Sequence, residues 1–249
     1  MIYHILNGDS IGYRFPQAKI PGEAIIFREA LMSGPLNGET QEEFWSTRAK
    51  QHKRGSNEYQ SMVIDELNQI AASKAGYEFN LWFEYDVFCQ ANSWFVYSLL
   101  SQLSHTIKVF TVLTTHLEQG HKYFWNGFGP ATPEQLRACF NNRIQLTKKD
   151  LALGNQLWQA FRNRDNNTLQ QLSKQQSPAF PYLKDIVEAH LDTERPARVI
   201  NEIVDTGTMG FENTFSAFWK QESIYGFGDV QLKVIYASVM HERKQRKNY

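Results

Sequence analysis

Residues 2–10 read Ile-Tyr-His-Ile-Leu-Asn-Gly-Asp-Ser, an apolar run that ends in the polar turn Asn7-Gly8-Asp9-Ser10. A short apolar stretch rich in β-branched and aromatic residues, followed by a turn signal, is typical of a buried strand. Residues 24–27, 79–83 and 107–113 have the same character. Together with residues 2–6 they predict four strands.

Helical patterns separate these predicted strands. Thr40-Gln41-Glu42-Glu43 has the form of a capping box, and Val63, Leu67 and Ile70 recur at helical spacing. Residues 87–103 are long and apolar enough for a core helix. Strands that alternate with helices pair in parallel through crossover connections. The sequence therefore predicts an α/β fold with a small, mostly parallel, Rossmann-like sheet of about four strands flanked by helices.

The chain changes character near residue 130. Thr132-Pro133 is typical of a helix N-cap followed by proline at the first helical position. Further helices are predicted to open at residues 147–150, to begin at Pro181, and to cover residues 196–206, 211–222 and 229–243, with no strand among them. We therefore predict an α/β domain over residues 1–128 and an all-helical C-terminal region over residues 129–249.

Composition excludes some classes of function. The 249 residues include 26 Lys and Arg and 26 Asp and Glu, so no net charge draws the whole chain to nucleic acid or an anionic membrane. The N-terminus becomes polar too early for a signal peptide, and no apolar stretch is long enough to span a bilayer. Cys89 and Cys139 are interpreted as buried, reduced thiols. We expect a cytoplasmic protein with no membrane partner, while a local basic patch for nucleic acid stays open.

Polar side chains follow each predicted strand directly. They are Asn7, Gly8, Asp9 and Ser10 after the first strand, Arg28 and Glu29 after the second, Glu84 and Asp86, with Gln90 one helical turn further, after the third, and Thr114, Thr115 and His116 after the fourth. The carboxyl ends of parallel strands meet at one edge of a sheet, and ligands bind in the crevice there. We therefore expect these side chains to surround one site.

The residue types suggest roles at such a site. Crowded carboxylates raise one another's pKa or bind a divalent cation, so the acidic residues are the catalytic candidates: Asp9, Glu29, Glu84 and Asp86. Arg28 would bind an anionic group, because a guanidinium donates two parallel hydrogen bonds. The remaining candidates would contact the ligand: Asn7, Gly8, Ser10 and Gln90. The pattern assigns neither a particular metal nor a cofactor.

Each candidate also has a structural interpretation. The Asn7–Ser10 stretch has an ordinary turn composition, and by itself the turn is the favoured interpretation. Arg28 and Glu29 are suited to a structural salt bridge. Glu84 and Asp86 precede an apolar helix whose dipole they would complement. The case for a site rests on the coincidence of all these groups at one edge.

The strong catalytic and nucleotide-binding motifs are missing from the sequence. There is no Gly-x4-Gly-Lys-Ser/Thr loop and no Gly-x-Gly-x-x-Gly after the first strand, which disfavours dinucleotide binding. No His-Glu-x-x-His motif, nucleophile elbow or kinase signature is present. His116 and His121 are five residues apart and do not share a helix face, so no metal is assigned to them.

Three blocks of the first half resemble a known family. They are residues 4–10 (His-Ile-Leu-Asn-Gly-Asp-Ser), 21–29 (Pro-Gly-Glu-Ala-Ile-Ile-Phe-Arg-Glu, with Gly34-Pro35 after it) and 81–90 (Leu-Trp-Phe-Glu-Tyr-Asp-Val-Phe-Cys-Gln). The family is bacterial and is called domain of unknown function eighteen thirty-five. The resemblance covers about residues 1–125, and segments 157–161, 190–191, 195–196 and 225–231 resemble the helical companion region often seen after it.

The family has no established activity to carry over. The resemblance implies that the candidate residues from Asn7 to Gln90 occupy the family's motif positions. One departure is Phe27, where a tryptophan is often expected before the Arg-Glu pair.

Two functions follow as hypotheses. The first is a protein that binds a small polar or anionic ligand at the strand-end site, with metal-assisted catalysis as an extension. The alternative is a regulator or interaction module that uses the C-terminal helices against DNA or a partner protein. The connection at residues 223–228 is longer than in a helix-turn-helix, and the last helix shows no base-reading face, so nucleic acid is the less favoured partner.

Overall fold

Five strands form one sheet in the order β2-β1-β3-β4-β5 in the computed structural model, which describes residues 1–51, 55–114 and 127–246. The first four strands are parallel: β1 (Ile2–Asn7), β2 (Glu23–Phe27), β3 (Glu78–Trp82) and β4 (Lys108–Val112). Each lies within one residue of its predicted bounds. The prediction of an α/β fold with a mostly parallel sheet is confirmed.

The prediction that no strand follows residue 130 is wrong. Ile144 and Gln145 form β5 (Ile144–Gln145), which pairs antiparallel with Thr111 and Phe110 of β4. A two-residue strand is too short to show a period of two in the sequence. It forms because it covers backbone groups of β4 that would otherwise lie at an open edge of the sheet.

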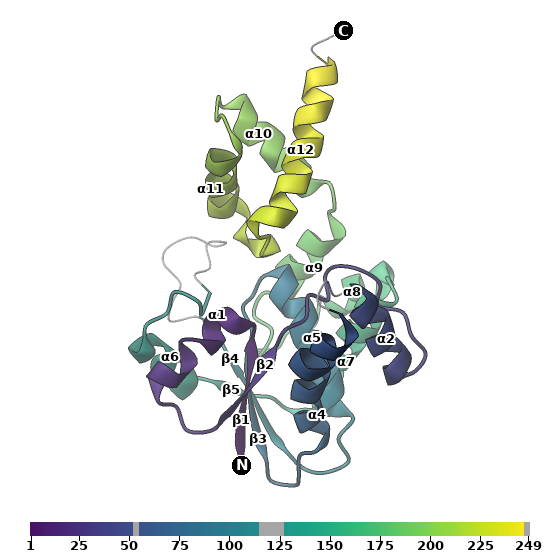
Figure 1. Cartoon of the computed structure of the whole chain (residues 1–249), viewed down its shortest axis with the longest axis vertical. Coiled ribbons are helices and arrows are strands. Elements are labelled where there is room, and N and C mark those ends of the chain that lie inside the picture. The colour runs from purple at the N-terminus through teal and green to yellow at the C-terminus, as the bar shows by residue number, and fades with distance from the viewer. Residues whose placement is uncertain (52–54, 115–126, 247–249) are drawn as a thin grey trace.

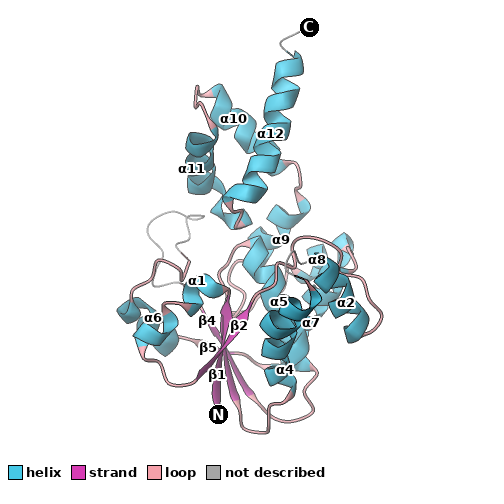
Figure 2. Cartoon of the chain, in the orientation of Figure 1, coloured by secondary structure: helices cyan, strands magenta, loops and turns pink. Residues whose placement is uncertain are grey.

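Helices cover both faces of the sheet (Figure 1, Figure 2). One face carries α1 (Asp9–Gly12), η1 (Phe15–Ala18) and α6 (Pro133–Asn141), and the other carries α2 (Gln41–Gln51), α4 (Asp65–Ala71), α5 (Val87–Ser101) and α7 (Lys148–Arg162). Ile5 and Leu6 of β1 belong to different hydrophobic clusters, because successive side chains of a strand point to opposite faces. The sheet is therefore buried on both sides.

The remaining helices complete the chain. They are α3 (Ser56–Tyr59), the π-helical η2 (Gln60–Ile64), α8 (Asn166–Leu172), α9 (Leu183–Leu191), α10 (Arg195–Asp205), α11 (Phe211–Glu222), η3 (Ser223–Tyr225) and α12 (Asp229–Arg246). The helix predicted to begin at Pro181 begins two residues later, at Leu183. In Figure 1, α10, α11 and α12 form a lobe beyond the carboxyl edge of the sheet. Among the described residues no helix has the length and apolar character needed to cross a membrane.

The helix-start signals in the sequence are confirmed. The amide of Glu43 donates to the Thr40 hydroxyl at 3.1 Å, and the amide of Thr40 donates to the Glu43 carboxylate at 3.3 Å. Capping boxes of the same kind open α6 at Thr132 and α7 at Thr147. These local contacts satisfy first-turn amides, so the sequence alone places the helix starts well.

Helix α7 packs against α5 through large aromatic side chains. The ring centroids of Phe95 and Trp158 are 5.0 Å apart, and those of Trp94 and Phe161 are 5.9 Å apart. All four belong to one hydrophobic cluster together with Ile5 of β1. The core of the α/β half therefore includes a helix that follows the predicted boundary at residue 128.

A buried ion pair joins the loop after β2 to α2. The Arg48 guanidinium donates to both Glu29 carboxylate oxygens, at 2.6 and 3.0 Å, and the two side chains are only 5% and 4% exposed. The hydroxyl of Tyr59 in α3 donates to the same carboxylate. Burial raises the pKa of Glu29, but the hydrogen bonds and charge of Arg48 outweigh it, so the pKa lies below its ordinary value. Glu29 is therefore ionised, and its partners hold it in place.

Removing one member of this pair should destabilise the fold strongly. We expect Arg48→Met to lower the free energy of unfolding by about 3–5 kcal/mol, because it leaves the Glu29 carboxylate buried and uncompensated. Urea denaturation measures the change. The matched control is Lys184→Met in the exposed Lys184–Glu188 pair, 71% and 60% exposed, which should cost less than about 1 kcal/mol. Equal effects of the two substitutions would show that the buried pair does not stabilise the fold.

Candidate functional site

The carboxyl edge of the sheet has a topological switch point between β1 and β3. From β1 the chain moves outward to β2 on one side, and then returns to β3 on the other. The helices after these two strands lie on opposite faces, which opens a crevice at the strand ends. Asn7 at the end of β1 pairs with Phe27 of β2, and Leu6 pairs with Trp82 of β3. The loops that follow these strands therefore start at one edge.

Asp9 and Arg28 meet at this edge. Nε of Arg28 donates to Oδ1 of Asp9 at 2.9 Å, and the side chains are 44% and 23% exposed in the order Asp9, Arg28. Nη1 of Arg28 also donates to the carbonyl of Met62 in η2 at 3.3 Å and lies 3.6 Å from the carboxylate of Glu66. Two carboxylates thus compensate one guanidinium, and the pair is open to solvent on the Asp9 side.

The turn after β1 leaves room for a ligand. Gly8 has φ +90°, and apart from its chain neighbours no atom of the described residues lies within 4 Å of the point where a side chain would begin. The Ser10 side chain is exposed at the same turn. Gly129 approaches the Ser10 hydroxyl so closely that a side chain at Gly129 would collide with it. With respect to the described residues, the backbone of this turn is therefore uncovered at Gly8 and bordered by Gly129.

Beneath this turn, Asn7, Glu84 and Cys89 form a polar network. Nδ2 of Asn7 donates to the Cys89 sulfur at 3.0 Å, and Oδ1 of Asn7 accepts from Asn92 at 3.0 Å. The Cys89 thiol donates to Oε2 of Glu84 at 3.4 Å, and the amide of Phe128 donates to Oε1 of Glu84 at 3.0 Å. Asn7 was predicted to contact the ligand, but both polar atoms of its side-chain amide are bonded to other residues of the protein.

Burial controls the ionisation of this network. It raises the pKa of the Cys89 thiol well above its ordinary value, and the nearby charges of Asp86 and Glu84 raise it further. Burial also raises the pKa of Glu84. The thiol is therefore protonated and unsuited to nucleophilic attack. Gln90, predicted to contact ligand, donates to the backbone carbonyl of Glu84 at 2.7 Å and supports the loop after β3.

Asp86 caps α5 and meets the C-terminal lobe. Its Oδ1 accepts from the amide of Cys89 at 2.8 Å, which is the N-cap contact of α5. Gly226, with φ +63°, lies so close to the Asp86 carboxylate that no side chain would fit there. Burial, followed by the charge of Glu84, raises the pKa of Asp86 to about 7. The cap is also a joint between the two halves of the chain.

The four predicted carboxylates do not form one cluster. Asp9 pairs with Arg28, Glu29 turns away to Arg48, Glu84 accepts from Phe128 and Cys89, and Asp86 caps α5. Nowhere in residues 1–51, 55–114 and 127–246 do three His, Cys, Asp or Glu side chains come close enough to hold a metal ion. Thr114 is buried after β4, and the candidates Thr115 and His116, like His121, lie outside the described residues.

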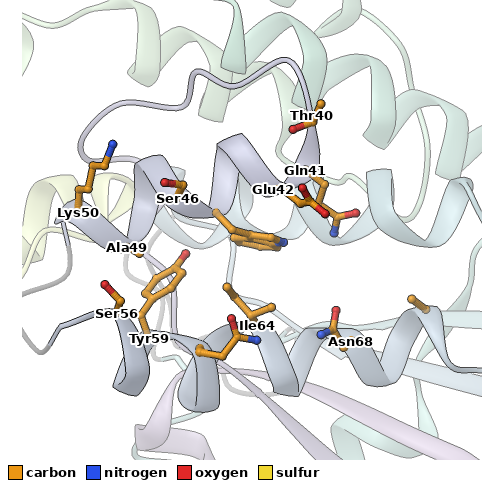
Figure 3. Close-up of a pocket in the computed structure, with 13 residues that line it drawn as sticks. Thr40, Gln41, Glu42, Ser46, Ala49, Lys50, Ser56, Tyr59, Ile64 and Asn68 are labelled. Carbon is orange, nitrogen blue, oxygen red and sulfur yellow. The ribbon is translucent and has the colours of Figure 1, made fainter.

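The sequence did not single out a groove of about 900 Å³ between α2 and α3–α4 (Figure 3). Amide and hydroxyl side chains such as Gln41, Ser46 and Asn68 line its walls. Among the described lining residues, the negative charge of Glu42 balances the positive charge of Lys50. The capping box and the apolar stripe predicted the two helices. Which of their outer faces would enclose a groove depends on how they pack, and one sequence does not contain that information.

The raised pKa of Asp86 predicts a pH-dependent stability. The folded protein keeps this carboxyl protonated up to about pH 7, whereas the unfolded chain releases the proton near the ordinary pKa of 3.8. The contribution of Asp86 to the free energy of unfolding is therefore full below about pH 4 and is lost as the pH rises through 7. Asp86→Asn still caps α5, and it should shrink the stability difference between pH 5 and pH 8 by at least about 1 kcal/mol in urea denaturation.

The control for this experiment is Asp205→Asn, which neutralises an acid of the C-terminal lobe paired with Arg243 at 2.6 Å. It should leave the pH profile of the wild-type protein in place. A profile that Asp86→Asn also leaves unchanged would mean that Asp86 is ionised in the folded protein throughout this range.

Comparison of the chain with protein-family models, with curated protein sequences and with solved protein structures finds no match in any of the three. The resemblance to domain of unknown function eighteen thirty-five therefore stays a prediction, and the function of the site has to be argued from its geometry.

Proposed function

We propose that this protein binds a small polar or anionic ligand on the turn after β1, at the switch point between β1 and β3. The observation that carries the proposal is the partly exposed Asp9–Arg28 pair, 2.9 Å apart, beside Gly8, which no described residue outside its turn approaches within 4 Å of the Cβ position. Doubly wound sheets bind ligands at the carboxyl edge of their switch point, which supports this location. The ligand would lie over residues 8–10, between the loop after β2 and Gly129.

The chemistry of the pair indicates what the ligand must carry. Arg28 uses Nε and Nη1 within the protein, and no described residue accepts a hydrogen bond from its Nη2. This nitrogen supports contact with a carboxylate, phosphate or carbonyl oxygen of the ligand. Asp9 offers a carboxylate acceptor, and Ser10 offers a hydroxyl. A ligand with an anionic or carbonyl oxygen and a neighbouring donor would satisfy both members of the pair without separating them.

Metal-assisted catalysis is not part of this proposal. The carboxylates that would hold a cation are committed to other partners, and Glu29 in particular is enclosed by Arg48 and Tyr59. The proposal is for reversible binding, with Glu84 beneath the turn as a carboxyl whose pKa burial raises.

The C-terminal helices support a second candidate function, a module that binds a partner protein or DNA. Val230 and Val234 of α12 lie one helical turn apart and are 69% and 70% exposed. Large apolar side chains in adjacent exposed positions favour contact with another protein surface over contact with DNA. This function would not depend on Asp9 or Arg28.

A ligand screen with matched variants tests the first function. Nucleotides, phosphorylated metabolites and amino acids are screened for an increase in Tm, which should reach about 5 °C for a ligand at 100 times its Kd. Asp9→Asn should lose most of this increase, because the amide no longer orients Arg28 by charge. Asp205→Asn, which alters an acid–arginine pair in the C-terminal lobe, should keep it.

Two results would count against the turn after β1. One is a ligand whose Kd is unchanged in both Asp9→Asn and Ser10→Ala. The other is a ligand whose binding is lost when Val230 and Val234 are replaced by glutamine, since that result would favour the C-terminal lobe instead.

A further inference from the structure

A second, separate pocket lies between the loop after β2 and the ends of α7 and α9. Its volume is about 260 Å³. The residues that line it include Leu31, Met32 and Leu36 from the loop and Arg162, Arg164, His190 and Thr193 from the helix ends. None of them belongs to the candidate site at the switch point.

The polar side of this pocket is basic. Arg162, Arg164 and His190 line it, and its described lining includes no acidic residue. Two acids that flank lining residues in the sequence have partners elsewhere, since Asp165 accepts from Thr168 and Asp192 pairs with Arg198 at 2.7 Å. Within the described part of the chain, neither arginine has a carboxylate partner. In a protein with equal numbers of acidic and basic residues, this is a local excess of positive charge.

Arg162 is held in a fixed orientation. Its Nε donates to the carbonyl of Leu36 at 2.8 Å, its Nη2 donates to the carbonyl of Gly38, and its guanidinium lies 5.3 Å from the centre of the Phe44 ring. These contacts are to neutral groups, so they orient the guanidinium without neutralising it. Because the Arg162 side chain is already ordered, little conformational entropy is lost when an anion binds to it.

Arg164 occupies a backbone position that favours glycine. It follows Asn163, the C-cap of α7, and has φ +55°, in the left-handed region. Helices commonly end with glycine in this conformation, because a side chain makes it unfavourable. An arginine at such a position strains the backbone, and here its side chain lines the pocket. Strain of this kind is concentrated at ligand sites, where the side chain has a role.

His190 and the apolar wall complete the pocket. Burial lowers the pKa of His190, so its ring is neutral at neutral pH and has one N–H to donate. The ring packs on Phe161 with centroids 5.0 Å apart. Leu31, Met32 and Leu36 line the pocket as well. The pocket therefore offers cationic and hydrogen-bond donors together with an apolar wall.

We propose that this pocket binds a small organic oxyanion, a carboxylate or a phosphate group carried on a short apolar body. Arg162 and Arg164 would bind the oxyanion by charge-assisted hydrogen bonds, with donors from His190 and Thr193 beside them. The apolar body would pack against the leucine and methionine side chains of the loop after β2.

Three probes with the same ring test this proposal by isothermal titration calorimetry. They are benzoate, phenyl phosphate and the neutral phenol, titrated at one ionic strength set with sodium chloride. At least one of the two anions should bind the full-length protein, and phenol should bind at least 10-fold more weakly than that anion. The stronger of the two anions identifies which oxyanion the pocket takes.

Arg164→Gly is the informative variant, because glycine relieves the backbone at this position and the protein should fold with an equal or higher Tm. It should weaken anion binding at least 10-fold. The control is Arg14→Ala, an exposed arginine outside the pocket, which should leave the Kd unchanged. The proposal is overturned if neither anion binds at 10 mM, if phenol binds as well as the anions, or if Arg164→Gly and Arg14→Ala have the same Kd as the wild-type protein.

Discussion

The buried contact between the Glu29 carboxylate and the Arg48 guanidinium holds the loop after β2, and three surfaces of the protein border on that loop. Arg48 donates not only to Glu29 but also to the backbone carbonyls of Ser33 and Ala30, at 2.6 and 3.2 Å. The Arg48 guanidinium therefore donates to two carbonyls of the loop and also compensates the buried charge of the Glu29 carboxylate. Because ion pairs this deep in a protein are costly to break, this contact holds the loop against α2.

Each of the three surfaces borders a different part of the loop or of the residues that contact it. Arg28, one residue before Glu29, points toward Asp9 and the turn after β1. Tyr59, which donates to Glu29, lines the groove between α2 and α3–α4. Further along the loop, Leu31, Gly34 and Leu36 line the basic pocket. The loop therefore connects the candidate site to two cavities, and no residue of the candidate site lines either cavity.

The sequence predicted the helices and strands well, but it predicted the hydrogen-bond and ion-pair partners of the candidate carboxylates poorly, for a physical reason. Strands, helix caps and the parallel sheet depend on local periodicity and on contacts three or four residues apart, so their signals are present in a short window. The partners of the predicted carboxylates are distant. Glu29 pairs with a residue 19 positions away, Glu84 accepts from Phe128 44 positions away, and Asp86 meets Gly226 in the last quarter of the chain. The strand ends do meet at one edge, and the local pattern indicated the cap that Asp86 forms on α5, but it did not indicate the distant partners of Glu29 and Glu84 or the contact of Asp86 with Gly226.

Charge couples the joint between the two halves to the candidate site. Asp86 lies against Gly226 of the C-terminal lobe, and the charge of Glu84, beneath the turn after β1, contributes to its raised pKa of about 7. Interaction between two titrating groups is mutual, so a change in the ionisation of Glu84 changes the proton affinity of Asp86 by the same free energy. Because the two carboxyls share the loop after β3, the ionisation of Glu84 beneath the turn and that of Asp86 at the joint are linked.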